Sequence, residues 1–313
     1  MAKPPKLKPR ALRPGDRVAI IAPASYPHRD DFNAGCDALR RLGYVPVYDD
    51  SIFDRELYFA GSTERRVREL EQAFEDDTVK AIVCARGGYG SNYLLGKVGV
   101  NKIAAHPKIF VGYSDLTSLM TYFYDQIGLV TFHGPMVAKD FNKSDGVDAS
   151  SWRFALEQPS SFAPAANSTL RPLAAGEAEG ILYGGCLSML AESLGTPYEI
   201  HTSGTILFIE DVAAHPYQID RMLMHLKLAG KLNQVRGLVF GEMLDCGPAA
   251  TQSFSLEEII TRVVADLNVP VAYGLRSGHV SRQNITLPMG VNASLRVDTS
   301  SVKLEILEPA TIA

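Results

Sequence analysis

Short apolar runs alternate along the first part of the chain with longer segments in which apolar residues recur every three or four positions. The runs at 17–22, 45–48, 81–85, 109–111 and 129–132 predict strands, because strands buried on both faces of a parallel sheet read as nearly continuous hydrophobic stretches. Helical spacing between them, as at Phe32, Cys36 and Leu39, predicts covering helices. This alternation is typical of a parallel α/β sheet with right-handed crossovers.

Two of the predicted helices carry further expectations. Ser62 is expected to cap a helix whose apolar positions Val67, Leu70 and Phe74 line one face, and its charged residues at 64–66, 68 and 69 are interpreted as the solvated face. A second helix is predicted over 92–98, between the third strand and the fourth.

The pattern weakens after residue 140. Residues 141–176 are rich in Asn, Ser, Asp, Pro and Ala, with one short helical piece near 152–156, and are interpreted as a linker. Strands are then predicted at 180–185, 205–209 and 235–240, helices at 217–228 and 256–267, and an antiparallel ribbon at 291–307. We therefore predict an N-terminal α/β domain over 1–140, a linker over 141–176 and a C-terminal domain of mixed α/β structure over 177–313.

Composition removes several classes of function. The chain has 313 residues, 46% of them hydrophobic and 21% charged, with a net charge of −4 and no basic cluster beyond its first residues, so a nucleic-acid partner is not expected. No apolar run approaches the ~20 residues of a membrane helix, and nothing resembles a signal segment, so we expect a cytoplasmic protein. The cysteines lie far apart, which disfavours both a zinc site and a disulfide framework.

The stretch 108–117 holds the first candidate for chemistry. Ser114 follows the apolar run 109–111 and precedes a predicted helix, and such a turn lifts a serine hydroxyl clear of the sheet, as in a nucleophile elbow. The usual second glycine is replaced by Leu116. In the alternative reading, Ser114 or Asp115 only caps the helix that follows.

A serine nucleophile needs a base and an orienting carboxylate. The adjacent acids Glu210 and Asp211 end the predicted strand 205–209 and supply candidates for the carboxylate. Among the seven histidines, His133, His215 and His279 lie in suitable loops, and local context does not separate His133 from His279.

The turn after the strand 81–85 offers backbone donors. Gly87 and Gly88 allow close approach of the main chain to a ligand, so one of their amides could bind an oxyanion together with the amide of Asp115. Arg86 beside them is a candidate for binding a substrate carboxylate, with a structural ion pair as the alternative. A dinucleotide-binding turn is discarded, because the third glycine of that motif is missing.

Taken together and in order, several motifs resemble the LD-carboxypeptidase family of serine peptidases, the muramoyl-tetrapeptide carboxypeptidases. The resemblance covers nearly the whole chain. The matching segments are Arg13-Pro14-Gly15-Asp16, Phe59-x-Gly61-Ser62, Arg86-Gly87-Gly88-Tyr89-Gly90, Gly112-Tyr113-Ser114-Asp115, His133-Gly134-Pro135-Met136, Glu210-Asp211, Pro216-Tyr217-x-x-Asp220-Arg221, Gly278-His279 and Leu287-Pro288-x-Gly290.

The resemblance implies a catalytic triad of Ser114, His279 and Glu210, with no metal and no other cofactor. It also implies a flavodoxin-like or amidotransferase-like first domain, a homodimer, and a substrate site that we expect to include Arg86 and Tyr113. Family members often have asparagine where this chain has Cys186 and glutamate where it has Ala214. Both departures bear on the substrate.

The activity that the resemblance implies is hydrolysis of the L,D-peptide bond that holds the terminal D-alanine of a murein tetrapeptide, as in peptidoglycan recycling. The alternative is a hydrolase of the microcin-immunity branch, which cleaves a peptide–nucleotide conjugate. A silent periplasmic-receptor-type binding protein and a glutamine amidotransferase are disfavoured, the latter because it would need cysteine at position 114.

Overall fold

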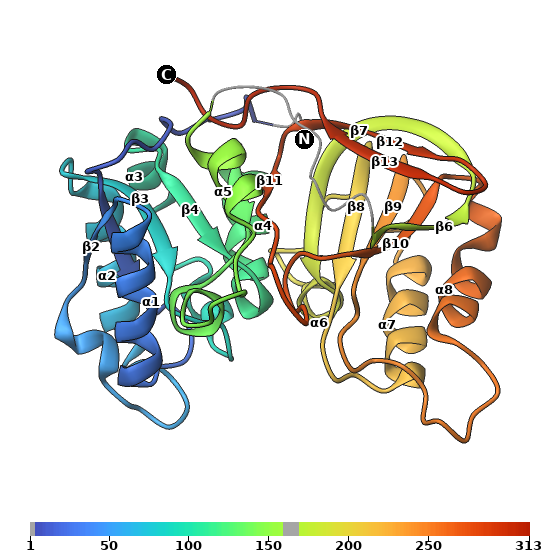
Figure 1. The fold of residues 1–313 in the computed structure, drawn as a ribbon, viewed down its shortest axis with the longest axis horizontal. Coiled ribbons are helices and arrows are strands. Elements are labelled where there is room, and N and C mark those ends of the chain that lie inside the picture. Colours follow the sequence, from blue (N-terminus) through green and yellow to red (C-terminus); the bar gives the residue numbers. More distant parts are fainter. Residues whose placement is uncertain (1–3, 159–168) are drawn as a thin grey trace. The chain divides into compact units, whose positions relative to one another are not determined.

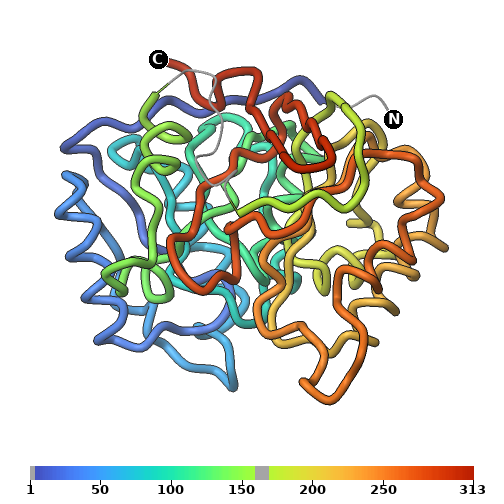
Figure 2. Tube along the Cα trace, turned by 45° about the vertical axis from the view of Figure 1, so that its right-hand side comes forward, coloured from blue at the N-terminus to red at the C-terminus, as the bar shows by residue number. Residues whose placement is uncertain are grey.

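The computed structural model describes residues 4–158 and 169–313. Two compact units divide the chain: the first takes in residues up to 160 together with 282–290 and 309–313, and the second takes in 161–281 and 291–308. The predicted division at residues 140 and 176 leaves out the two late segments that return to the first unit. The last residues of the chain make this return: the amide of Ala11 donates to the carbonyl of Ile312 at 2.8 Å. Figure 2 shows the C-terminal end of the trace, in red, near segments from the N-terminal part of the chain, in blue.

The first unit is built on a six-stranded sheet with the order β11-β5-β4-β3-β1-β2 (Figure 1). All neighbouring pairs are parallel except β11 with β5. The strands are β1 (Arg17–Ile21), β2 (Val45–Val47), β3 (Val79–Cys84), β4 (Ile109–Gly112), β5 (Thr131–His133) and β11 (Leu287–Met289). Apart from β11 this is the flavodoxin order 2-1-3-4-5, whose ligand-binding switch point lies between β1 and β3. The predicted flavodoxin-like domain is confirmed.

Helices cover both faces of this sheet. Three of them, α2, α3 and α4, follow one another along one face, while α1 covers the other and packs against a single π-helical turn at Val137–Phe141. Their bounds are α1 (Arg29–Arg41), α2 (Thr63–Glu75), α3 (Val100–Ala105), α4 (Thr117–Ile127) and α5 (Ala149–Leu156). Between α2, β4 and α4 the rings of Phe74, Phe110 and Phe123 form a buried core.

The prediction of a helix over 92–98 is wrong. A short 3₁₀ turn covers Ser91–Leu94, and the α-helix begins only at Val100. Gly96 lies between them with a φ of +72°, a left-handed conformation that ends a right-handed helix. Ser62 does cap α2 as predicted, since its hydroxyl accepts from the amide of Arg65 at 3.2 Å.

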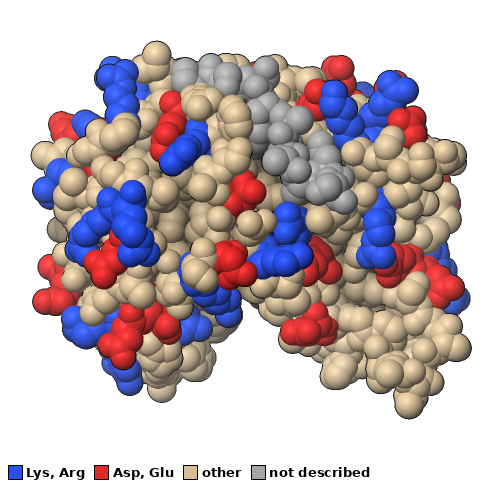
Figure 3. Space-filling view, viewed as in Figure 1, with Lys and Arg blue, Asp and Glu red and all other residues tan. Residues whose placement is uncertain are grey.

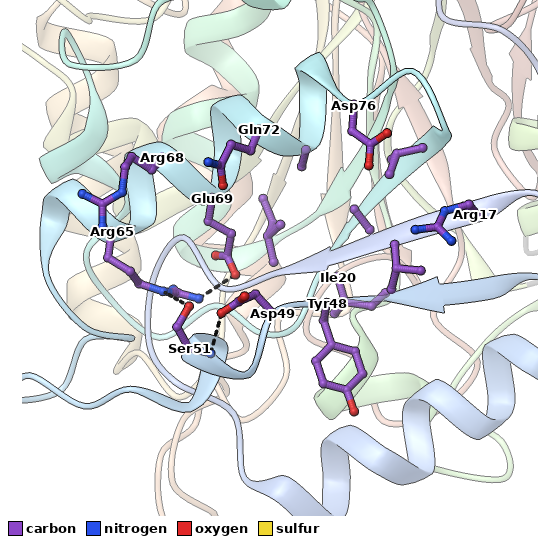
Figure 4. Close-up of a pocket in the computed structure, with 15 residues that line it drawn as sticks. Arg17, Ile20, Tyr48, Asp49, Ser51, Arg65, Arg68, Glu69, Gln72 and Asp76 are labelled. Atoms are coloured by element: carbon purple, nitrogen blue, oxygen red, sulfur yellow. Dashed lines mark hydrogen bonds and ion pairs between the residues drawn. The ribbon is translucent and has the colours of Figure 1, made fainter.

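The charged residues of α2 also differ from the prediction of a solvated face. Arg66 is completely buried and its guanidinium donates to the carbonyls of Pro23 at 2.9 Å and Gly90 at 2.7 Å. Arg65 and Glu69 line a polar cavity of about 470 Å³ against β1, where an ion pair of 2.6 Å joins them (Figure 4). Burial raises the pKa of the Glu69 carboxyl to about 7. The charges point inward because main-chain groups of the loop after β1 need partners there.

The second unit contains a mixed seven-stranded sheet with the order β13-β12-β7-β8-β9-β10-β6. Its strands β7, β8, β9 and β10 are parallel, and β6, β12 and β13 pair in antiparallel fashion. The bounds are β6 (Arg171–Ala174), β7 (Gly176–Cys186), β8 (Thr205–Glu210), β9 (Gly237–Gly241), β10 (Val271–Leu275), β12 (Asn292–Val297) and β13 (Val302–Ile306). The predicted mixed domain and its C-terminal ribbon are confirmed.

Three helices of the second unit lie side by side: α6 (Leu187–Glu192), α7 (Pro216–Leu228) and α8 (Leu256–Val264). In the predicted linker, α5 and β6 are formed, and residues 159–168 lie outside the described part of the chain. No helix among the described residues is both long and apolar enough to cross a bilayer. On the face shown in Figure 3, basic and acidic side chains are interspersed.

Candidate active site

Ser114 lies on a strained turn of the first unit. It follows β4 directly after Tyr113 and has a φ of +64°, which non-glycine residues rarely adopt. Neither of the two helical turns that follow is capped by a side-chain hydrogen bond, so the capping alternative does not account for this serine. A positive φ at a serine between a buried strand and a helix is the geometry of a nucleophile elbow.

The loop after β3 lies directly against this serine. A Cβ added to Gly87 would lie 2.9 Å from Cβ and 3.1 Å from Oγ of Ser114, and 3.5 Å from the amide nitrogen of Asp115. Gly88 has a φ of +104°, and a Cβ there would lie 2.4 Å from the hydroxyl of Ser25. The main chain at Gly87 therefore lies directly beside the Ser114 hydroxyl and the Asp115 amide.

The carboxylate of Asp115 holds this loop in place. It accepts hydrogen bonds from the amides of Gly90 at 3.2 Å and Ser91 at 2.8 Å, and the Ser91 hydroxyl donates to the Asp115 carbonyl at 2.6 Å. Burial raises the pKa of the Asp115 carboxyl, and those amide donors oppose the shift. Because Arg66 also donates to the carbonyl of Gly90, both the amide and the carbonyl of this residue are held by hydrogen bonds.

This support involves two residues to which the sequence analysis gave no role. Ser25, after β1, accepts from the amide of Tyr89 at 3.2 Å, and its own amide donates to the carbonyl of Gly87 at 3.3 Å. Arg66 was assigned to the wet face of its helix. Their position in the sheet could have pointed to a role. The loops after β1 and β3 flank the switch point of a flavodoxin-like sheet, where ligand-binding loops gather.

Two predicted substrate residues lie in different surroundings. Arg86 is half-buried, its Nη1 lies 3.5 Å from the carbonyl oxygen of Tyr26, and no carboxylate among the described residues pairs with it. Tyr113 is only 1% exposed, and its hydroxyl donates to Asp140 at 3.4 Å. Burial of this kind favours Tyr113 as a residue that positions the turn, and its contact with substrate stays a prediction.

The second unit brings Glu210 and His279 together. Glu210 ends β8, completely buried, and its Oε2 accepts from the backbone amide of His279 at 2.9 Å. The imidazole Nδ1 of His279 lies 2.8 Å from the same oxygen. A carboxylate at Nδ1 fixes the tautomer that leaves Nε2 able to accept a proton. This contact is the arrangement that a general base and its orienting acid require.

Asp211 has a different task. Its Oδ2 accepts from the amide of Ser188 at 2.9 Å and from the hydroxyl of the same residue at 2.7 Å, and its Oδ1 accepts from the amide of Val212 at 2.8 Å. Burial raises the pKa of the Asp211 carboxyl. The choice between the two acids, which the residues alone left open, thus falls to Glu210 as the partner of His279.

The cysteines do not offer a competing nucleophile. All four are buried thiols. Burial raises the pKa of Cys36 and Cys246 to about 11 and that of Cys84 and Cys186 well above its usual value, so the thiolate is scarce at neutral pH. Among the described residues, no group of three His, Cys, Asp or Glu side chains is placed to hold a metal ion.

Comparison with protein-family models identifies the family to which the chain belongs. Residues 18–134 match the model of the LD-carboxypeptidase N-terminal domain, and residues 179–295 match that of the LD-carboxypeptidase C-terminal domain. The chain belongs to the LD-carboxypeptidase family. As a member it is a serine-type carboxypeptidase, and the resemblance recognised from its motifs is confirmed.

Three relatives illustrate the range of this family. The chain is 38% identical to the probable murein peptide carboxypeptidase of Bacillus subtilis over 301 residues, covering 95% of this chain and 94% of that protein. The structure of muramoyltetrapeptide carboxypeptidase from Oxalobacter formigenes is 31% identical, with a TM-score of 0.82 over 93% of this chain and 99% of that one. The microcin C7 self-immunity protein of Escherichia coli is 27% identical over 94% of each chain.

The close approach of Gly87 to Ser114 gives a first testable expectation. Gly87→Ala introduces a methyl group that must displace the serine side chain or the loop, so kcat should fall by about 10², the typical cost of a small misplacement of reacting groups. Gly247→Ala is the matched control, because nothing lies within 4 Å of its added Cβ. Steady-state kinetics with a check of the unfolding midpoint measures both. A folded Gly87→Ala enzyme with unchanged kcat contradicts the placement of this loop at the reacting centre.

Proposed function

We propose that this protein hydrolyses the L,D-peptide bond at the end of a murein tetrapeptide and releases the terminal D-alanine, as in peptidoglycan recycling. Two observations support the proposal: in the first unit a strained serine next to a glycine loop, and in the second unit a histidine whose Nδ1 is held by a buried glutamate. The names of the relatives in Bacillus subtilis and Oxalobacter formigenes support the substrate class.

In the proposed mechanism Ser114 and His279 converge when the substrate is bound. The Oγ of Ser114 attacks the carbonyl carbon of the L,D-bond while Nε2 of His279 takes the hydroxyl proton. The oxyanion of the tetrahedral intermediate is stabilised by the amide of Asp115 and by that of Gly87 or Gly88. Glu210 holds the imidazole in the required tautomer and stabilises its charged form.

The intermediate then collapses. The C–N bond breaks, the imidazolium gives its proton to the leaving amine, and D-alanine departs from an acyl-enzyme on Ser114. Water attacks the acyl group with His279 again as base, which releases the shortened peptide and restores the serine. Arg86 is proposed to bind the free carboxylate of the terminal residue, because a guanidinium pairs with a carboxylate through two parallel hydrogen bonds. No step needs a metal ion.

The competing reading is cleavage of a peptide–nucleotide conjugate, as suggested by the relationship to the microcin C7 self-immunity protein. Only five residues, 211–215, separate the end of β8 from the start of α7. This compact connection, which carries no long insertion, favours the carboxypeptidase reading. A cytoplasmic location and a homodimer stay predictions from the sequence.

Incubation of the purified enzyme with a free murein tetrapeptide and, separately, with an aminoacyl-adenylate analogue tests this proposal. We expect mass spectrometry to show a loss of one alanine from the tetrapeptide, unchanged by EDTA, and no cleavage of the conjugate. Cleavage of the conjugate without cleavage of the tetrapeptide would assign the protein to the microcin-immunity branch. Loss of tetrapeptide cleavage on EDTA treatment would contradict the metal-free mechanism.

A further inference from the structure

A short segment after β1, residues 22–25, joins helix α2 to the loop beside Ser114. Its last residue, Ser25, is hydrogen-bonded to Gly87 and Tyr89 of that loop. Main-chain groups of the three preceding residues are held by α2 and the chain that leads into it. They are the amide of Ala22, which donates to Oε2 of Glu69 at 3.0 Å, the carbonyl of Pro23, which accepts from Arg66 at 2.9 Å, and the carbonyl of Ala24, which accepts from the amide of Ala60 at 2.9 Å. We call residues 22–25 the connecting segment.

The connecting segment orients one of the backbone donors proposed for the oxyanion. The amide of Ser25 donates to the carbonyl of Gly87 at 3.3 Å. Because a peptide group is planar and trans, this hydrogen bond also fixes the direction of the N–H on the opposite side of the same plane, which belongs to Gly88. A shift of the connecting segment would therefore turn this N–H relative to Ser114.

Glu69 is the charged anchor of the connecting segment. Its side chain is only 10% exposed and lies at the wall of the polar cavity beside α2 (Figure 4). Both carboxylate oxygens are engaged, Oε2 by the amide of Ala22 at 3.0 Å and Oε1 by the guanidinium of Arg65 at 2.6 Å. Arg65 also donates to the carbonyl of Ala60 at 3.1 Å. Hydrogen bonds to an ionised carboxylate are roughly twice as strong as neutral ones, so the hold on Ala22 depends on the charge of Glu69.

Glu69 changes its charge near neutral pH, whereas the groups around it do not. Burial raises the pKa of the Glu69 carboxyl to about 7, against the opposing charge of Arg65. Hydrogen bonds with neighbouring hydroxyl and amide groups hold the pKa values of Asp49 and Asp76 below their ordinary range, and burial raises that of the Cys84 thiol well above its own. Arginine stays protonated in proteins, and a phenol titrates at about pH 10. The charged and titratable groups that line the cavity or face Glu69 are Arg17 of β1, Tyr48 and Asp49 after β2, Arg65, Arg68 and Asp76 of α2 and its C-cap, and Cys84 of β3.

We propose that Glu69 is a positioning residue for the reaction, whose ionised carboxylate holds the connecting segment and, through Ser25, the loop that supplies backbone donors beside Ser114. Glu69 acts at a distance, through main-chain hydrogen bonds. Its protonation loosens the connecting segment and lowers the reactivity of Ser114. The inference rests on the proposed function only in taking Ser114 as the nucleophile, so its test uses a reagent that needs no murein peptide.

The first test compares the enzyme with Glu69→Gln, the neutral isostere of protonated glutamic acid. The second-order rate with which a fluorophosphonate modifies Ser114 is measured at pH 8 and at pH 5.5. The unmodified enzyme should react about tenfold faster than the variant at pH 8, a typical coupling through a chain of contacts, and at the same rate at pH 5.5. The ratio of the two rates cancels the titration of His279, which is common to both proteins.

Glu71→Gln is the matched control on the same helix. Glu71 also accepts from one backbone amide and one cation, Gly99 and Lys102, each at 2.8 Å, but both lie at α3 and not at the connecting segment. This variant should react at the rate of the unmodified enzyme at both pH values.

A second test needs no variant and covers the case in which Glu69→Gln does not fold. In ¹⁵N-labelled unmodified enzyme, the amide resonances of Ala22 and Tyr89 should shift with one common midpoint at about pH 7, because the first donates to Glu69 and the second to Ser25. The amide of Gly99 is the reference. Against burial, hydrogen bonds from Lys102 and Gly99 lower the pKa of Glu71, so the Gly99 resonance should show no step at that midpoint.

Several results would overturn the inference. A rate ratio that is equally large at both pH values means that Glu69 only supports the fold, and a ratio of one at both means that it has no part in positioning. A Tyr89 resonance that does not follow Ala22 breaks the proposed link. Failure of the unmodified enzyme to react with the fluorophosphonate would contradict the proposed function instead, and the amide titration then decides on the link by itself.

Discussion

Replacing Ser114 with alanine is expected to lower kcat for D-alanine release by about 10⁴ or more, with little change in KM. The variant keeps the turn but removes the attacking oxygen, so only the backbone donors and substrate binding are left to accelerate the reaction. His279→Ala should cost about as much, and the double variant should fall little further, because nucleophile and base act as one unit.

Steady-state and single-turnover kinetics on the three variants measure this. Ser118→Ala, one helical turn further along α4, is the matched serine control and should keep nearly full activity. Retained turnover in Ser114→Ala, or losses in the single variants that multiply in the double variant, would contradict a shared catalytic step.

The second large effect concerns the neighbouring acids of the second unit. Glu210→Gln should lower kcat by about 10⁴, because an amide that donates to Nδ1 of His279 moves the imidazole proton to Nε2 and blocks proton acceptance there. Asp211→Asn is the control of equal chemistry one residue away. It should keep kcat within about tenfold and lower the unfolding midpoint instead, since Asp211 accepts from Ser188 at the start of α6.

Kinetics and thermal unfolding of both variants distinguish these roles. Equal losses of kcat in Glu210→Gln and Asp211→Asn would mean that the carboxylates act together, contrary to the separate hydrogen bonds of the two side chains. Near-normal turnover by a folded Glu210→Gln enzyme would remove glutamate from the triad.

Much of the fold could be predicted because its strands are buried and its helices amphipathic. The parallel core of the first unit follows from apolar runs such as 81–85 and 109–111. The ribbon β12–β13 follows from the alternation of apolar and polar residues along the chain. What could not be predicted depends on distant pairing. Strand β11 has only three residues and joins β5 across more than 150 residues of chain. No local pattern specifies such a partner.

In the candidate site, too, local sequence patterns predict some features, and contacts between distant residues determine the others. The turn at Ser114 and the glycines of the next loop are local signals, and the sequence places them correctly after strands. The choice of Glu210 over Asp211 depends on which side chain reaches His279, and the burial of Arg66 depends on carbonyl groups of two other loops. Both depend on tertiary contacts, and only the family resemblance had named Glu210 as the acid that contacts His279.

Phosphonylation of Ser114 tests the central claim, that His279 activates this serine, most directly. A fluorophosphonate should modify the enzyme at one residue, Ser114, as mapped by peptide mass spectrometry, with a second-order rate that falls by several orders of magnitude in His279→Ala. The Gly247→Ala control should react at the normal rate. Modification of Ser114 at equal rates with and without His279 would contradict the account.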